Sequence, residues 1–502
     1  MKHKTIYLIL ASFSLLGAVF DAGARERADS QKLQKIFNSP GNVANTVAFL
    51  RAQDGKVLFS YNPSRVLMPA SVTKLVTSAV LLDKFGPDKT FITRFYHTGT
   101  LINGNISGDL IVVGDGDPFL VSEKLWQAVS DLHHLGVRRI KGNIIVDQSL
   151  FRSAELDRSR ESGKYQSEHA YDAPVSAFAV NFNTIALAIA PVHRLSSKSV
   201  QRPLVAIDPY PIDGVSIINR ARSVSGNSHS IKVTRVTQAN SKMKLVVEGV
   251  TSGGRSLEKV YRSLGPKTEI AGEYLRSFLE ARGIVVNGGV KTGRKNMSAK
   301  LLYELPSYPL AKMILGLNKY SNNFIADVLT KRLGAEFPSI GRANAVGSGT
   351  YENGRFAIEK YLKEQIELKS MFVFNNGSGL STKNRFSANG LSGLLVHIYR
   401  KMSVFPEFLS SLPASGVDGT LKDRFKKSKF RGLIGNVRAK TGTLTEPVSA
   451  SSLAGYVRHP VHGMVAFAII QNGITGKKQP SIGALRDSQE ESLLFFLNYF
   501  KN

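Results

Sequence analysis

The chain of 502 residues contains no cysteine, one tryptophan, and 38 acidic residues against 66 Lys and Arg. The lack of cysteine excludes disulfides, cysteine nucleophiles, thiolate zinc sites and cysteine-ligated iron–sulfur clusters. Any covalent catalysis therefore needs another nucleophile. Gly and Pro form no tracts, and 42% apolar residues suffice for sizeable cores, so collagen-like and disordered classes are excluded. Beyond the first residues, no apolar run approaches the length of a membrane span.

The N-terminus has the features of a targeting segment. Lys2, His3 and Lys4 precede the apolar run Ile6–Phe20, and Ala22-Gly23-Ala24 offers an A-x-A cleavage site. We predict a cleavable secretory signal peptide over residues 1–24, with a retained anchor as the alternative. An exported protein without cysteine is compatible with an oxidising compartment.

The net positive charge indicates which classes of binding partner such a protein would favour. Cleavage would remove Lys2, Lys4 and Asp21, so the formal charge of +28 would become +27. This charge favours nucleic acid, anionic lipid or acidic cell-wall polymer, and nucleic acid is the least available of these outside the cell. A solvated basic surface without a partner remains the alternative.

The pattern of apolar residues predicts both helices and strands, and the length suggests about three domains. Asp54-Gly55 between apolar segments predicts a hairpin. Apolar residues at helical spacing predict a helix from Ser71 to Gly86-Pro87. Residues 91–293 consist of short apolar segments separated by turn-forming residues, which predicts short strands. Further elements are predicted as helices over 310–329 and 356–362, strands over 437–439, 452–457 and 464–470, and a helix over 484–500.

Three short motifs carry the candidate chemistry. Ser71 and Lys74 open a helix, and their spacing puts both side chains on one face, where the amine can reach the hydroxyl. Lys74 could act as a base only if burial and neighbouring cations lower its pKa. Ser321-Asn322-Asn323 lies between two helical patterns, and Lys440-Thr441-Gly442 ends a strand. A hydroxyl, an amide and a second cation suit an acyl-transfer site, and Gly442 would let the strand backbone approach the substrate.

Each motif alone is weak, because the chain contains imitations of all three. Ser256-Leu257-Glu258-Lys259 also fits S-x-x-K, Ser387-Ala388-Asn389 fits S-x-N, and Lys291-Thr292-Gly293 is a second K-T-G. Context and order separate the two sets, since only Ser71 opens a long apolar helix and only Lys440 follows a well-placed S-x-N.

The ordered set resembles the penicillin-recognising serine acyltransferases. Ser321 follows Ser71 by 250 positions, and this large insertion resembles the low-molecular-mass class C penicillin-binding proteins, which are D-alanyl-D-alanine carboxypeptidases and endopeptidases of the periplasm. The similarity covers nearly the whole chain after residue 24. It includes Gly114-Asp115-Gly116-Asp117-Pro118, Tyr171-Asp172-Ala173-Pro174-Val175-Ser176-Ala177, Gly377-Ser378-Gly379-Leu380-Ser381 and Gly419-Thr420-Leu421.

The resemblance implies an α+β architecture with nested insertions. A transpeptidase-like (serine β-lactamase-like) catalytic domain, an antiparallel sheet with helices, would comprise residues 25–90 and 298–502. Residues 91–189 and 266–297 would form a β-rich second domain, and residues 190–265 a β-rich third domain inserted into the second.

The resemblance also implies a role for each motif residue. Ser71 would attack a D-alanyl-D-alanine carbonyl with Lys74 as base, and Ser321 with Lys440 would return the proton to the leaving amine. Asn323 would hold the substrate amide and orient Lys74. Thr441 and Thr443 would bind the terminal carboxylate or that of a β-lactam, and the Ser71 and Thr443 N–H groups would form the oxyanion hole. No metal or organic cofactor is implied.

Two expected contacts to the substrate rest on weaker parallels. The position where the family often has an arginine for the diamino acid is Thr382, so Lys383 would supply that charge less rigidly. Asp147 resembles a carboxylate that reaches the pocket, or is a turn aspartate capping a strand end.

The expected partners are peptidoglycan stem peptides and cross-links, β-lactams as covalent inhibitors and an acidic cell-wall polymer. Carboxypeptidase and endopeptidase activity use the same acyl-enzyme, so both remain open. The alternatives are a sacculus-binding protein without turnover and, less favoured, a β-lactamase, for which no deacylating base can be placed.

Overall fold

The computed structural model describes residues 27–152, 168–192, 201–237, 242–265, 269–366 and 372–500, so the predicted signal peptide lies outside the described residues. The chain divides into two compact units. The first holds the residues up to Asp83, Ile314–Ser321 and the residues from Glu359 onward, and the second holds Lys84–Met313 and Asn322–Ile358. The finer scheme of three nested domains stays a prediction.

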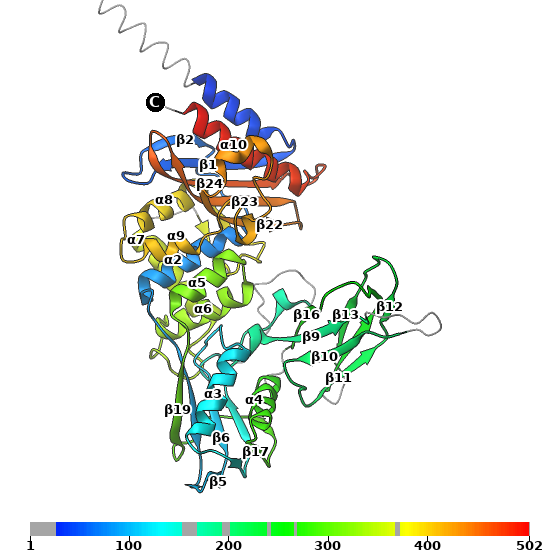
Figure 1. The fold of residues 1–502 in the computed structure, drawn as a ribbon. Helices are drawn as coiled ribbons and strands as arrows, with labels where there is room; N and C mark the ends of the chain where they lie inside the picture. Colours follow the sequence, from blue (N-terminus) through cyan, green and yellow to red (C-terminus); the bar gives the residue numbers. More distant parts are fainter. Residues whose placement is uncertain are drawn as a thin grey trace, which may run out of the picture. The chain divides into compact units, whose positions relative to one another are not determined.

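The first unit is built on an antiparallel five-stranded sheet (Figure 1). Its strand order is β2 (Val57–Tyr61), β1 (Val43–Arg51), β24 (Gly463–Gly473), β23 (Ala450–His459) and β22 (Val437–Leu444). β1 and β2 form the hairpin that Asp54-Gly55 predicted, with a φ of +77° at Gly55. β1 also pairs with β24 along its whole length, from Val43 opposite Gly473 to Arg51 opposite Val465.

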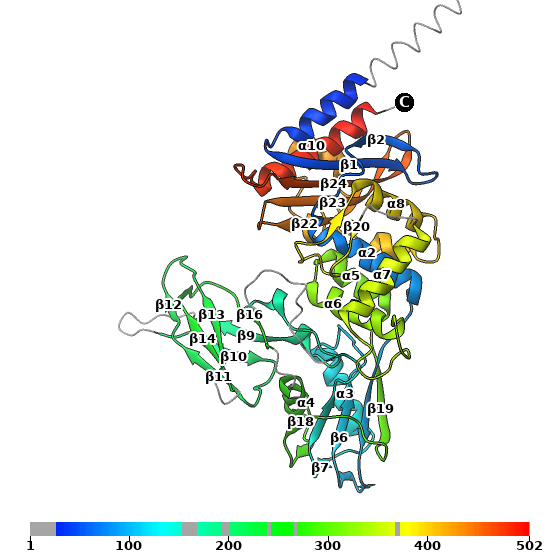
Figure 2. The same cartoon turned by 180° about the vertical axis from the view of Figure 1, so that it is seen from behind.

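Helices cover both faces of this sheet (Figure 2). A helix over 27–38 and α10 (Ile482–Tyr499) pack on one face, where Phe49 stacks on Phe496 with ring centroids 4.2 Å apart. α8 (Ala388–Tyr399) packs on the other, and the Leu395 carbonyl accepts a hydrogen bond from the Tyr456 hydroxyl at 2.7 Å. The first unit also contains α2 (Thr73–Phe85) up to Asp83, α9 (Phe405–Ser411), β20 (Phe372–Val373) and β21 (Arg385–Phe386). The predicted combination of an antiparallel sheet with helices is confirmed.

The second unit is rich in strands, as the short apolar segments of residues 91–293 predicted. One sheet has the strand order β18 (Val290–Thr292), β8 (Ile144–Asp147), β6 (Leu110–Val113), β3 (Ile92–His97) and β19 (Lys300–Pro306), and another has the order β17 (Val285–Val286), β7 (Arg139–Ile140), β5 (Asn105–Ile106) and β4 (Leu101–Ile102). Two three-stranded sheets have the orders β10 (Leu204–Asp208), β9 (Thr184–Ala190), β16 (Glu258–Ser263) and β11 (Val215–Asn219), β14 (Met243–Glu248), β13 (Lys232–Thr237). β12 (Arg222–Val224) and β15 (Val250–Ser252) form a two-stranded sheet.

Helices complete this unit. α3 (Ser122–His134) and α4 (Glu269–Ala281) pack against each other, and their apolar faces share one core with the strands around them. α6 (Asn323–Glu336) belongs to the same unit, whereas α5 (Leu310–Lys319) and α7 (Tyr351–Gln365) cross from one unit into the other. None of the helices within the described ranges combines the length and apolarity that a membrane crossing needs.

A buried carboxyl in the second unit makes stability depend on pH. Asp117 is 5% exposed, its Oδ1 accepts a hydrogen bond from the Phe119 N–H at 2.8 Å, and burial raises its pKa to about 7 from 3.8. The folded protein therefore binds more protons than the unfolded chain between these two values. Stability from this group is present below about pH 4 and is lost as the pH rises to about 7.

We expect Asp117→Asn to gain stability relative to the wild type as the pH rises, because its carboxamide keeps an acceptor for the Phe119 N–H but carries no charge. The difference in the free energy of unfolding should change by about 2–4 kcal/mol between pH 4 and pH 8. Urea denaturation at both pH values measures it, with the exposed Asp213→Asn as control. A difference that does not change with pH would contradict the shifted pKa.

Candidate active site

Ser71 and Lys74 lie one turn apart at the start of a helix. Ser71 belongs to the short turn η1 (Ala70–Val72), and Lys74 is the second residue of α2. Lys74 Nζ donates a hydrogen bond to Ser71 Oγ at 3.1 Å. Lys74 is completely buried, whereas Ser71 is partly exposed. The three-residue spacing thus forms the contact that the sequence predicted.

The segment Gly377-Ser378-Gly379 fixes the Lys74 amine from a second direction. The Ser378 carbonyl oxygen accepts a short hydrogen bond from Lys74 Nζ. Gly379 has a φ of +78°, and a Cβ on it would lie 2.2 Å from the Ala70 carbonyl oxygen. Glycine is therefore required for this segment to lie against the helix start.

A second hydroxyl–amine pair joins Ser321 to Lys440. Ser321 follows α5, and Lys440 lies on β22. Lys440 Nζ donates hydrogen bonds to Ser321 Oγ at 2.8 Å and to the Thr441 carbonyl at 2.7 Å. Complete burial, and secondly the charge of Lys74, hold the pKa of Lys440 well below its ordinary value. Such an amine exchanges protons at a lower pH than a solvated lysine, which suits a proton relay.

The backbone is strained directly before Ser71 and at Ser321. Ala70, directly before Ser71, has a φ of +50°, and Ser321 has a φ of +56°. Residues other than glycine rarely adopt this left-handed region, which costs of order 1–3 kcal/mol each. The surrounding packing therefore imposes this backbone shape at two points of the site.

A pocket of about 250 Å³ adjoins the two serines. Thr441 and Thr443 line it from alternate positions of β22. Thr441 Oγ1 donates a hydrogen bond to Thr420 Oγ1 at 2.7 Å, and Arg486 Nη2 donates one to Thr443 Oγ1 at 3.3 Å. The pocket is lined by Ser71, Ser321, Thr420, Arg424, Thr441, Thr443 and Arg486.

Three of these lining residues were not predicted. Arg424 Nε donates to Glu490 at 2.8 Å in a buried ion pair, so its charge is neutralised locally. Arg486 is exposed on α10 and directs its guanidinium to the pocket. Thr420 stands in Gly419-Thr420-Leu421, so the resemblance contained a signal for it. No local pattern marks the arginines, which are distant in sequence from the motifs.

Gly442 allows β22 to lie directly against the start of the Ser71 helix. A Cβ at Gly442 would lie 2.5 Å from the Pro69 carbonyl oxygen and 3.1 Å from the Ser71 nitrogen. Glycine was expected to let the strand approach the substrate, whereas the close neighbour is the backbone around Ser71. The predicted strand over 437–439 was also too short, because β22 continues to Leu444 through pairing with β23.

The direction of the N–H groups on β22 follows from its register. The Ala439 N–H donates to the Pro413 carbonyl at 3.0 Å, on the side of β22 away from β23. Because N–H directions alternate along an antiparallel strand, the Thr443 N–H points to the same side. Thr443 thus offers a backbone donor beside the pocket that its side chain lines.

Asn323 and Asp147 belong to the second unit. Asn323 is buried at the first position of α6, and its Nδ2 donates to the Tyr171 carbonyl at 3.4 Å. Asp147 ends β8 and is buried, and its two carboxylate oxygens accept the N–H groups of Ser149 at 2.9 Å and Lys295 at 2.7 Å. Of its two interpretations, this geometry favours the aspartate that caps a strand end.

Lys383 belongs to the first unit. Its side chain is exposed, and it is not one of the residues that line the pocket. A contact between Lys383 and a substrate stays a prediction.

Comparisons with known proteins show the family of this chain. The family model described as D-Ala-D-Ala carboxypeptidase 3 (S13) matches residues 30–490. A D-alanyl-D-alanine carboxypeptidase of Actinomadura sp. (strain R39) is 28% identical over 93% of this chain and 86% of its own length.

Two solved structures share the fold. Penicillin binding protein 4 (dacB) of Haemophilus influenzae has a TM-score of 0.72 and 22% identity, covering 92% of this chain and 99% of its own, and it has also been solved with a β-lactam. A predatory endopeptidase of Bdellovibrio bacteriovorus has a TM-score of 0.53 and 18% identity over 91% and 94% of the two chains. On the extent of the family match, this chain belongs to the D-Ala-D-Ala carboxypeptidase 3 (S13) family.

Proposed function

We propose that this protein hydrolyses the bond after a D-alanine in peptidoglycan stem peptides, through an acyl-enzyme on Ser71. The observation that carries the proposal is the buried Lys74 amine 3.1 Å from the Ser71 hydroxyl, beside a pocket that also adjoins the Ser321–Lys440 pair. Family membership supports the same reaction.

In the acylation step, Lys74 in its neutral form takes the proton of Ser71 while Oγ bonds to the D-alanyl carbonyl carbon. The two lysines repel each other when both are charged, which favours loss of one proton from the site. The N–H groups of Ser71 and Thr443 donate to the oxygen that becomes negative, and in other hydrolases each such donor contributes roughly 3–4 kcal/mol.

Ser321 and Lys440 complete the step. When the tetrahedral intermediate breaks its C–N bond, the leaving amine takes a proton from the Ser321 hydroxyl, which Lys440 replaces through its 2.8 Å hydrogen bond. Water then attacks the ester carbon and loses a proton, which restores Lys440 through Ser321, and Lys74 returns its proton to Ser71 Oγ as the ester C–O bond breaks. Asn323 is proposed, from the family motif, to hold the substrate amide and orient Lys74.

The carboxylate of the leaving residue is proposed to bind Thr441, Thr443 and Arg486. The two threonine hydroxyls line the pocket, and the guanidinium that contacts Thr443 carries the exposed charge there. A terminal D-alanine and the cross-linking centre of a diaminopimelate both place a carboxylate beside the cleaved bond. The same pocket thus suits trimming and cross-link cleavage.

Arg486→Ala should raise KM for a peptide ending in D-Ala-D-Ala about tenfold, with a smaller change in kcat, because a hydrogen bond to a charged group contributes about 1.5–3 kcal/mol. Arg486→Lys should recover part of the loss. The matched substrate ends in D-alaninamide and lacks the carboxylate, so the wild type and Arg486→Ala should cleave it equally. An equal loss on both substrates would contradict carboxylate binding.

A digest of purified sacculi tests the reaction itself. Mass analysis separates loss of terminal D-alanine from cleavage of cross-links in one profile. If neither product forms, the result contradicts the proposed hydrolysis and favours a sacculus-binding protein without turnover. β-Lactams are proposed to acylate Ser71 and to be released slowly, and fast penicillin turnover would instead indicate a β-lactamase.

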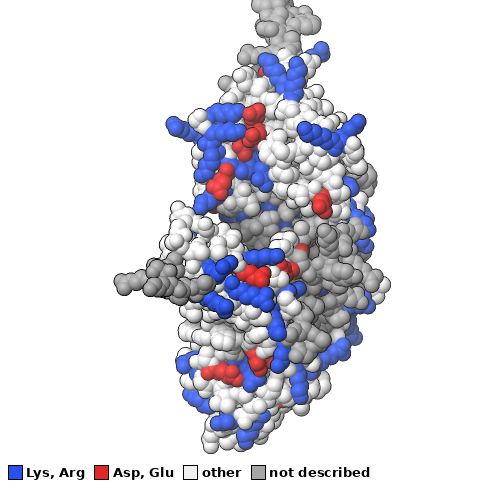
Figure 3. Space-filling model, turned by 90° about the vertical axis from the view of Figure 1, so that its right-hand side faces the viewer, with Lys and Arg blue, Asp and Glu red and all other residues white. Residues whose placement is uncertain are grey.

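The proposed location is the periplasm, with the basic surface held near acidic cell-wall polymer. On the face shown in Figure 3, Lys and Arg side chains predominate over Asp and Glu, in keeping with the net charge of +28 for the whole chain. Binding of the Ser71→Ala protein to sacculi should weaken as salt rises, since salt screens exposed charges. Salt-insensitive pelleting with sacculi would contradict the electrostatic contact.

A further inference from the structure

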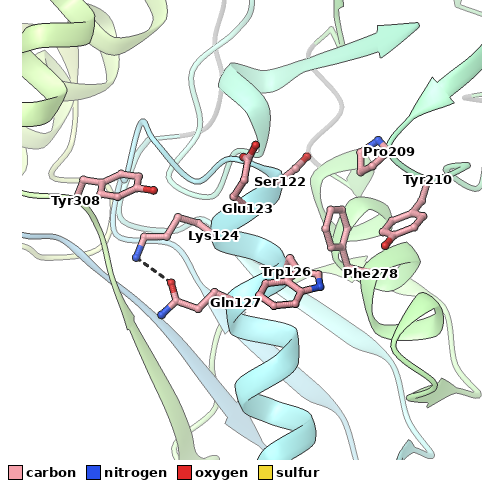
Figure 4. Close-up of a pocket in the computed structure, with 9 residues that line it drawn as sticks. All are labelled: Ser122, Glu123, Lys124, Trp126, Gln127, Pro209, Tyr210, Phe278 and Tyr308. Carbon is pink, nitrogen blue, oxygen red and sulfur yellow. Dashed lines mark hydrogen bonds between the residues drawn. The ribbon is translucent and has the colours of Figure 1, made fainter. Parts of the chain in front are cut away.

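The second unit contains an open pocket of about 640 Å³ that the motif residues do not line (Figure 4). Its walls come from the first turns of α3, from α4 and from the segments that follow β10 and β19. This volume lies within the usual range of small-molecule sites.

One wall of this pocket is aromatic. Trp126, the single tryptophan of the chain, is 58% exposed. Phe278 and Tyr210 pack edge to face beside it, with ring centroids 5.0 Å apart and planes at 82° (Figure 4). Among the described residues, the Trp126 indole N–H has no hydrogen-bond partner. An exposed indole at a concave site marks a binding surface more strongly than an isolated surface aromatic residue.

Polar groups border the same indole. Glu123 and Gln127 lie three residues before and one residue after Trp126 on α3, and all three side chains are exposed. Lys124 Nζ donates to Gln127 Oε1 at 3.3 Å. Lys124 and Lys312 also place ammonium groups 5.0 Å and 3.4 Å from the centroid of the Tyr308 ring. Tyr308 is thus engaged by cations, and Trp126 is the ring presented to a ligand.

We propose that this pocket binds an N-acetylhexosamine of a glycan strand. A pyranose has C–H groups on its faces, which pack on an aromatic ring, and hydroxyl and acetamide groups at its edge, which pair with side chains such as Gln127 and Glu123. A purely apolar ligand would bury those side chains without partners, at a cost of about 1–3 kcal/mol each. The inference rests on the proposed function, since the peptidoglycan substrate supplies the sugar.

Trp126 reports directly on this pocket, because no other tryptophan contributes to the emission. Titration of the full chain with tri-N-acetylchitotriose should give a saturable change in tryptophan fluorescence. Tyr210→Ala should weaken binding about tenfold, the effect of losing one aromatic contact. Tyr499→Ala, which removes a ring that is 50% exposed in the first unit, should bind as the wild type does.

Calorimetry with Trp126→Ala separates the possible outcomes. The variant should lose chitotriose binding while it releases D-alanine from a soluble peptide at the wild-type rate, which also shows that it is folded. Undiminished sugar binding by Trp126→Ala, no response of the wild type to chitotriose, or an equal response to cellotriose, which lacks the acetamide, would overturn the proposal. Sugar binding without D-alanine release would instead count against the proposed reaction and leave this site standing.

Discussion

Ser71→Ala should abolish covalent labelling by fluorescent penicillin and lower the rate of D-alanine release by at least about 10⁴-fold. Removal of the nucleophile from a serine hydrolase leaves only the rate enhancement from substrate binding and oxyanion stabilisation. Lys74 would remain buried without its hydroxyl partner. Gel fluorescence and a coupled D-alanine assay give the two readouts.

The chain supplies a matched control for this variant. Ser256 begins the imitation motif Ser256-Leu257-Glu258-Lys259 and is exposed in the second unit. Ser256→Ala should therefore label and hydrolyse like the wild type. Penicillin labelling that survives in Ser71→Ala would place the nucleophile elsewhere and remove the basis of the proposed mechanism.

Gly442→Ala should lower kcat/KM about 100-fold. The added Cβ would lie 2.5 Å from the Pro69 carbonyl oxygen and 3.1 Å from the Ser71 nitrogen, so no side-chain rotation can relieve the clash. β22 or the helix start must move, and a displacement of about 1 Å between reacting groups costs about that factor. Steady-state kinetics measures the loss, and thermal unfolding shows whether the fold survives.

The second K-T-G provides the comparison. A Cβ at Gly293 would meet only the Ile145 Cγ2 methyl, at 3.0 Å, and this flexible side chain can adjust. Gly293→Ala should therefore keep full activity. If Gly442→Ala were as active as Gly293→Ala, the close approach of β22 to Ser71 would not matter for the reaction.

Of the two hydroxyl–amine pairs in the site, one could be predicted from the spacing of its residues in the sequence. Ser71 and Lys74 are three residues apart on one helix, so their contact follows from helical geometry alone. The contact between Ser321 and Lys440 spans 119 positions, and only the family resemblance indicated it. Arg486 could not be found in this way, because it reaches the pocket from the C-terminal helix without any motif around it.

The same contrast applies to the fold. The hairpin at Asp54-Gly55 was predictable because the turn chemistry is local. The end of β22 was not, since Thr441 and Gly442 resemble a loop and become a strand by pairing with Leu453 and Ser452. Ser387, in the imitation S-x-N, caps α8 by accepting the Gly390 N–H at 3.0 Å, a role invisible in the triplet itself.

The pairing of β1 with β24 has a consequence for biogenesis. Val47 pairs early with Tyr61 of the neighbouring β2, but its partner on the other side, Ile469, lies on β24 near the other end of the chain, so the central sheet of the first unit is complete only after β24 has been synthesised. The inserted residues between Lys84 and Met313 can collapse earlier, and closure of such a distant pairing is slow. Lys440 lies on β22 of the same sheet, so the amine that pairs with Ser321 also joins the site late in synthesis.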